Sequence, residues 1–233
     1  MKPTKYVLHH YPATRSVRVR WALHETVGDD FEIRRVELYE GAQYERDYLA
    51  VNPNHNVPML EIHWEDGSVQ HMLESVAMVE WLADRHPDKA LCPSPTGGRD
   101  RADYLQLMHF GGTWLDMMLW QIRIHTHILG EQDADPKTLK RYREKFTTDG
   151  EPQLLSRLEK HEYILGDRLS AADFVIGHIV FWAKGYQLCE NERFSGYIAK
   201  LMTHAGLTKS LDDLSTFQVA PNEGQELAAR FNG

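Results

Sequence analysis

The stretch Asn52-Pro-Asn-His-Asn-Val-Pro-Met-Leu60, followed by the pair Glu74-Ser75, decides the fold of this chain. Pro58 cannot donate a hydrogen bond within a sheet, so we expect it to stand at the head of a strand. An X-Pro bond adopts the cis form at a cost of about 0.5–1 kcal/mol, and a cis bond here turns the backbone N–H and C=O of Val57 outward. These two groups are then placed to pair with the backbone of a peptide ligand.

The residues after this strand predict a hairpin and a helix. Asp66-Gly67 is a strong hairpin signal, and Val69 to Met72 forms the second strand. A helix over 74–86 follows at once, with Glu74 and Ser75 at its start. Its free N–H groups and the positive end of its dipole suit a ligand carboxylate beside the proline turn. The apolar stripe of this helix is expected to contain Ala77, Met78, Trp81 and Leu82.

Upstream, the pattern predicts a strand over 6–8, a helix from Ala13 to Gly28, a strand over 31–38 and a short helix over 44–50. The order is therefore βαβαββα, which resembles a thioredoxin-like domain. No Cys-x-x-Cys stands in the turn before the first helix, so we expect any thiol chemistry to come from a ligand.

Downstream, the chain becomes helical. Residues 99–129 predict a long helix, bent at Gly111-Gly112. Further helices are expected over 136–150, over 151–163 and between 194 and 214, the last broken at Gly206.

Ser170 and Asp173 form a capping box ahead of an almost wholly apolar helix. The fold class is thus an α/β thioredoxin-like N-terminal domain over 1–86, a Pro- and Gly-rich linker over 87–98 and an all-α domain over 99–233. No structure is predicted after Ser215.

Composition excludes several classes of function. The chain has 233 residues and a formal net charge of −8, which argues against a nucleic acid or an anionic membrane as partner. Cys92 and Cys189 lack the spacing of a disulfide framework or a zinc site. His9-His10 and His125-x-His127 do not converge on a strand or a helix, so no metal is expected. Neither a signal peptide nor a membrane span is evident, and we expect a cytoplasmic protein.

The motif Asn-Pro-x-His-x-Val-Pro, followed by Glu-Ser-x-Ala, resembles the glutathione-binding signature of the soluble glutathione transferases, especially their delta- and theta-like groups. The resemblance implies a cis bond before Pro58 and a backbone pairing of Val57 with the cysteinyl part of glutathione. It also implies that Glu74 and Ser75 hold the γ-glutamyl end and that His55 reaches toward the glycyl carboxylate.

The function implied by this resemblance is a glutathione S-transferase, an enzyme that conjugates the glutathione thiolate to a small hydrophobic electrophile or reduces a peroxide with it. Glutathione is then a co-substrate, no metal is needed, and the protein is a homodimer. Two alternatives stay open: a non-catalytic glutathione-binding module on the same scaffold, and a dehalogenase or isomerase that differs in its second substrate.

Thiolate stabilisation needs a hydroxyl donor at the start of the first helix, because a free thiol with a pKa of about 8.5 is mostly protonated at neutral pH. In delta- and theta-like members the catalytic serine lies four residues before an arginine, and counting back from Arg18 gives Thr14. Ser16 is the second candidate and Tyr11 the third. Thr14 or Ser16 acting only as an N-cap is equally compatible with the sequence.

The pocket for the electrophile is expected between the active turn and the long helix. Tyr11 is placed at its mouth, and the long helix that faces the active turn in the family contributes Trp114, Met117, Met118 and Trp120 to its wall. These helix residues are also compatible with a role in the core.

Overall fold

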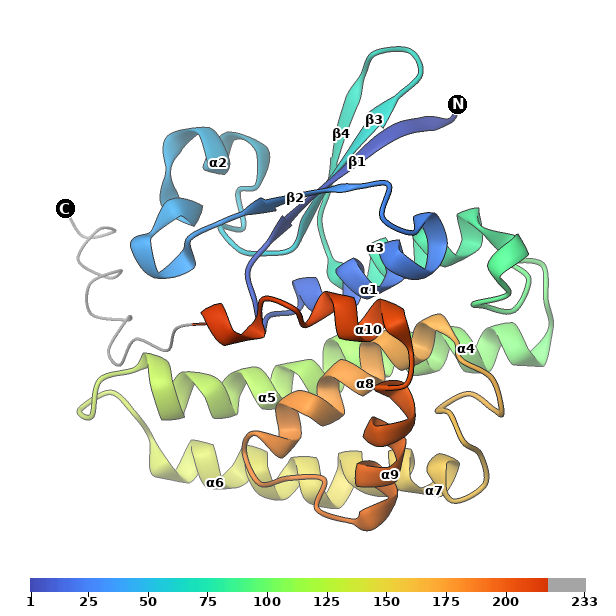
Figure 1. The fold of residues 1–233 in the computed structure, drawn as a ribbon. Coiled ribbons are helices and arrows are strands. Elements are labelled where there is room, and N and C mark those ends of the chain that lie inside the picture. Colours follow the sequence, from blue (N-terminus) through green and yellow to red (C-terminus); the bar gives the residue numbers. More distant parts are fainter. Residues whose placement is uncertain (218–233) are drawn as a thin grey trace.

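The computed structural model describes residues 1–217. Its sheet has four strands in the order β2-β1-β3-β4 (Figure 1). β1 and β2 pair in parallel, whereas β1 with β3 and β3 with β4 pair antiparallel. The strands are β1 (Pro3–His10), β2 (Glu32–Arg35), β3 (Met59–Trp64) and β4 (Val69–Met72). The predicted thioredoxin-like arrangement is confirmed.

Helices cover the sheet and make up the rest of the described chain. α1 (Ser16–Val27) and α3 (Ser75–Arg85) lie between the sheet and the helical half, and α2 (Arg46–Val51) lies apart from them (Figure 1). Short 3-10 turns occur at Leu38–Glu40, Ala42–Tyr44, Pro87–Lys89 and Leu214–Thr216. The helical half contains α4 (Arg99–His109), α5 (Asp116–Arg123), α6 (Pro136–Lys145), α7 (Glu151–Leu158), α8 (Ala171–Lys184), α9 (Glu192–Leu201) and α10 (Ala205–Ser210).

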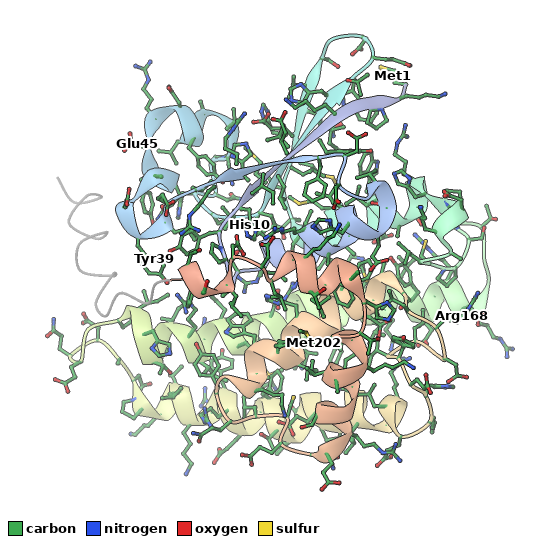
Figure 2. The ribbon with its side chains drawn as sticks, viewed as in Figure 1. Met1, His10, Tyr39, Glu45, Arg168 and Met202 are labelled. Atoms are coloured by element: carbon green, nitrogen blue, oxygen red, sulfur yellow. The ribbon has the colours of Figure 1, made fainter. Side chains whose placement is uncertain are left out.

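Strand β1 is longer than predicted, since it includes His9 and His10. His9 contacts Glu61 on one face, with Nε2 and Oε1 2.7 Å apart, and stacks near Tyr48 of α2. His10 points to the other face, toward the start of α1, because successive strand residues alternate. Figure 2 places His10 near the middle of the molecule, where β1 ends above the helices.

The main core runs without interruption from the sheet into the helical half. Trp21 of α1 stacks on Phe174 of α8, with ring centroids 4.5 Å apart. The predicted capping box of α8 is present: the Asp173 carboxylate, fully buried, accepts from the backbone N–H of Ser170 at 2.8 Å. Burial raises the pKa of Asp173 above its ordinary value. The domain limits at 86 and 99 stay a prediction.

The long helix predicted over 99–129 is present: residues 99–128 are helical throughout, with π-helical segments at Phe110–Leu115 and Ile124–Ile128, and the bend at Gly111-Gly112 stays a prediction. Another expectation for the helices was wrong. Gly206 does not break the C-terminal helices. It lies in the first turn of α10, where an added Cβ would stand 2.5 Å from Glu25 Oε1, so its small size serves packing.

The buried face of α3 also differs from the predicted stripe. Ala77 is exposed, and the buried residues are Ser75, Met78, Val79, Leu82 and Ala83. An alanine side chain buries little apolar area, so its presence in the apolar pattern does not indicate on which face of the helix it lies. The part of the predicted tail that follows residue 217 lies outside the described residues.

Gly112→Ala is expected to destabilise the protein by about 1–3 kcal/mol, because a Cβ at Gly112 would stand 2.5 Å from Cγ2 of Val76 in α3. Urea denaturation measures the change. Gly196→Ala is the control, since nothing lies within 4 Å of a Cβ at that helical position. Equal midpoints for the two variants would contradict the packing argument.

Candidate functional site

A cavity of about 470 Å³ lies where the turn after β1 meets the residues before β3 and two helices of the helical half. Its described lining includes the charged side chains Arg15 and Arg123 and no Asp or Glu. The other lining residues are Tyr11, Ala13, Thr14, Leu38, Tyr39, Gln43, Tyr44, Asn54, His55, Asn56, Val57, Trp120, Ile128, His178, Trp182 and Phe217. Figure 2 shows Tyr39 on the side of the sheet half that faces the helices.

Thr14 lies on the wall of this cavity, two residues before α1 begins, and is partly buried. Its Oγ1 donates to the backbone carbonyl of Tyr11 at 2.7 Å and lies 2.7 Å from Oγ of Ser16. It also accepts from the Ser16 N–H at 3.3 Å, a weak capping contact. The N-cap position itself is Arg15, which makes no side-chain capping bond. Thr14 thus lines the cavity at the positive end of the helix dipole, with its hydroxyl bonded to Tyr11 and Ser16.

Ser16, the second candidate from the sequence, is fully buried and does not line the cavity. Its Oγ lies 2.7 Å from Nδ1 of His10 and 3.0 Å from the carbonyl of Tyr11. It therefore stands behind Thr14. Tyr11, the third candidate, has its ring on the cavity wall, 5.4 Å from the ring of Tyr39 and 4.9 Å below the guanidinium of Arg35.

One buried carboxylate fixes the arginines at the start of α1. Asp116 of α5 accepts two bonds from Arg18 and one from Arg15 Nε at 2.8 Å. Although burial favours its neutral form, these cations hold the pKa of Asp116 below its ordinary value. His178 of α8 accepts from Arg18 Nε at 3.2 Å, and burial together with Arg18 lowers the pKa of His178 well below its ordinary value. The imidazole is consequently neutral.

Arg15 remains part of the cavity wall in spite of that bond. Its guanidinium lies between two indoles, 5.3 Å from the Trp120 ring and 5.0 Å from the Trp182 ring. Such stacking holds a planar cation in one orientation.

The segment before β3 contributes His55 and Val57 to the same cavity. The Val57–Pro58 bond is cis, as predicted. Asn52, which is buried, donates from Nδ2 to the carbonyl of Asn56 at 2.7 Å and so holds the loop closed. His55 adopts a φ of 43°, and its ring lies 5.0 Å from that of Tyr44.

Glu74 and Ser75 stand at the N-terminus of α3, as expected, but neither lines the cavity. Glu74 is the exposed N-cap residue, with a φ of 70° and no capping bond from its side chain. Its charge is close enough to act on the pKa of Arg15. Ser75 is buried and accepts from Arg18 Nη1 at 3.5 Å.

Trp114 and Met118, which were expected on the pocket wall, do not line the cavity. Met118 is fully buried in the main core. Trp114 is 40% exposed, with the Lys145 ammonium 4.7 Å from its ring. The π-helical turn between α4 and α5 shifts the helical register, and Trp120 and Arg123 are the residues of α5 that line the cavity.

Several cavity residues were not predicted at all. Arg123 follows an apolar run, Trp182 belongs to a helix assigned to the core, and Tyr39 directly follows a segment expected to be a strand. A second, more apolar space of about 310 Å³ adjoins the first and shares Ala13, Arg123, His178, Trp182 and Phe217 with it.

Residues 1–217 contain no group of three or more His, Cys, Asp or Glu side chains placed to hold a metal ion. In the same range, no helix has the length and apolar character that crossing a bilayer requires.

Comparison with known proteins agrees with this geometry. Residues 14–85 match the family model for the N-terminal domain of glutathione S-transferase. A maleylacetoacetate isomerase of Dictyostelium discoideum is 28% identical over 194 residues, which cover 81% of this chain and 84% of that protein. The glutathione S-transferase GstA of Escherichia coli O157:H7 is 26% identical over 185 residues, covering 78% and 84%.

Among solved structures, a glutathione transferase family member from Pseudomonas fluorescens Pf-5, crystallised with two glutathione molecules bound, has a TM-score of 0.75 at 22% identity and covers 90% of this chain and 93% of its own. The similar fold spans the helical half as well as the sheet. Residues 14–85 thus match a glutathione S-transferase N-terminal domain, and the described chain as a whole shares the fold of solved glutathione transferases.

Proposed function

We propose that this protein binds glutathione in the cavity, holds its thiol as a thiolate and transfers it to a small hydrophobic electrophile. The observation that carries the proposal is the position of Thr14. This residue lies at the N-terminal end of α1 and lines a cavity that Val57 and His55 also line.

The charge of the lining supports an anionic ligand. Arg15 and Arg123 lie on the described wall, which includes no Asp or Glu, and glutathione carries two carboxylates and a net negative charge. Structures of similar fold were solved with glutathione bound. In this proposal the Val57 backbone pairs with the cysteinyl unit, and His55 approaches the glycyl carboxylate.

Thr14 stabilises the thiolate of bound glutathione in this proposal. Lowering the thiol pKa by two requires about 2.7 kcal/mol of preferential stabilisation of the thiolate. One charge-assisted hydrogen bond together with a helix N-terminus is of this size. Apolar and aromatic side chains such as Trp182 and Phe217 then surround the second substrate.

Calorimetric titration with glutathione, followed by rate measurements with a panel of electrophiles, tests the proposal. Binding with turnover supports it. Binding without turnover of any electrophile would indicate the non-catalytic module instead. The absence of binding at millimolar glutathione would overturn the assignment.

A second candidate is a glutathione-dependent cis–trans isomerase of a carboxylated enedione or diene. The two arginines favour it, because they suit a second carboxylate, and relatives are named maleylacetoacetate and maleylpyruvate isomerase. An isomerase adds the thiolate to the double bond and later expels it, so glutathione is not consumed. Measuring glutathione consumption beside loss of the cis substrate separates the two reactions.

Glu74→Gln is expected to raise the KM for glutathione about 10-fold while changing kcat less than twofold. The carboxylate is proposed to hold the γ-glutamyl ammonium, and losing a charge-assisted bond weakens binding in the ground and transition states alike. Initial rates against glutathione concentration measure the effect. Glu144→Gln, on the exposed face of α6, is the control. A fall in kcat at constant KM would contradict this role.

A homodimer and a cytoplasmic location are proposed from the same family resemblance. Light scattering of the purified protein tests the first.

A further inference from the structure

A row of four polar side chains leads from the cavity into the protein. Thr14 Oγ1 lies 2.7 Å from Ser16 Oγ, and Ser16 Oγ lies 2.7 Å from Nδ1 of His10. The other nitrogen of that ring, Nε2, lies 3.0 Å from Oδ2 of Asp213. Only the first member lines the cavity, and His10 and Ser16 are fully buried.

The last member fixes the tautomer of the ring. Although burial favours a neutral carboxyl, His10 and Arg20 hold the pKa of Asp213 below its ordinary value, so it is a carboxylate. A carboxylate accepts, and the proton of a neutral His10 therefore sits on Nε2. Nδ1 is then a bare acceptor that faces the Ser16 hydroxyl.

We propose that His10 is the proton acceptor for the thiol of bound glutathione, reached through the hydroxyls of Ser16 and Thr14. This inference rests on the proposed function. The thiol S–H bond breaks as its proton moves to Thr14 Oγ1, the Thr14 proton moves to Ser16 Oγ, and the Ser16 proton moves to Nδ1. The products are a thiolate in the cavity and an imidazolium paired with Asp213.

The transfer reverses the direction of each hydrogen bond in the row. After the transfer, every hydroxyl of the row points its proton toward the cavity, so Thr14 donates to the thiolate that has formed. Both hydroxyls can donate to the carbonyl of Tyr11, at 2.7 and 3.0 Å, and each turns its proton from that carbonyl into the row when the transfer begins. Once the sulfur has reacted, His10 returns its proton along the same row to the product or to water.

The charged groups around His10 come from three elements. Asp213 precedes the last 3-10 turn, and Arg20 of α1 lies 3.2 Å from its Oδ1. Arg35 belongs to β2, and its pKa is raised by Glu37 and also by the charge of Asp213. Asp213 contacts the ring at 3.0 Å, and Arg20 in turn pairs with Asp213. Removing only the Asp213 charge should consequently shift the thiol equilibrium.

Asp213→Asn keeps an acceptor for Nε2–H and removes that charge. We expect the pKa of bound glutathione, followed by thiolate absorbance against pH, to rise by about one, from about 6.5 to about 7.5, which leaves about threefold less thiolate at pH 7. The kcat at pH 7 falls about threefold, and the affinity for glutathione measured by calorimetry changes less than twofold. Asp212→Asn is the matched control, because Asp212 pairs with Arg20 at 2.8 Å without contacting His10.

Ser16→Ala interrupts the row. It should raise the thiol pKa similarly, and adding Asp213→Asn to it should raise the pKa no further, because the two residues act through one path. A merely structural role for Asp213 predicts additive effects, or equal effects of the two aspartates. His10→Asn, which offers Ser16 an acceptor but takes no proton, repeats the comparison if Asp213→Asn is unstable.

The outcomes separate the two proposals. A wild-type protein that binds no glutathione overturns the proposed function, and the relay with it. A wild-type protein that binds glutathione and lowers its thiol pKa, together with an Asp213→Asn variant of unchanged thiol pKa, overturns the relay alone.

Discussion

Thr14→Val is expected to lower kcat about 100-fold at neutral pH and to raise the pKa of bound glutathione, with little change in glutathione affinity. Valine keeps the volume and the branched shape and removes the hydroxyl, so the loss reports the hydrogen bond to sulfur. Removal of one preorganised donor to a developing or resting anion typically costs about 100- to 1,000-fold in kcat. Rates across a pH series, with thiolate absorbance in parallel, measure both effects.

Thr14→Ser is the matched control, since it keeps the hydroxyl and removes only a methyl group. We expect a rate within about threefold of wild type and an unchanged thiol pKa, because the donor is the same. If Thr14→Val kept the wild-type thiol pKa, Tyr11 would become the stronger candidate, because its ring also lines the cavity. Ser16 does not line the cavity and would act only through the Thr14 hydroxyl.

The sheet half could be predicted in detail because its signals are local. Pro58 heads β3 and Asp66-Gly67 forms the hairpin turn, where Gly67 takes a φ of 83°. Gly28, with a φ of 69°, ends α1. In the same way, the capping box of α8 needs only two residues three positions apart. Each feature follows from the backbone preferences of one or two residues.

The helical wall of the site could be predicted only in part, because its geometry depends on register. A π-helical turn changes which side of a helix each later residue occupies, and nothing in the sequence around Gly111 marks its length. Trp114 and Trp120 are 40% and 39% exposed, and Trp120 lines the cavity whereas Trp114 does not. Asp213 lies about two hundred positions from His10, and no local pattern connects the two. Such contacts come only from the tertiary fold.

Asp116→Ala is expected to lower the free energy of unfolding by about 3–5 kcal/mol, the largest stability effect among these predictions. Arg18 is fully buried, and Asp116 is its only acidic partner among the described ion pairs. Without the carboxylate, the guanidinium stays in the interior with only neutral acceptors such as His178. The same change frees Arg15 Nε, so the cavity wall is also loosened.

Urea denaturation measures this change, provided the slope of the transition stays constant. Asp103→Ala is the control. Asp103 makes two bonds to Arg157 between α4 and α7, but its side chain is 43% exposed, so the expected loss is at most about 1 kcal/mol. Arg18→Met combined with Asp116→Ala should recover part of the lost stability, because it removes the uncompensated buried charge. If the double variant were as unstable as the sum of the single variants, packing around Asp116, and not the charge on Arg18, would account for the loss.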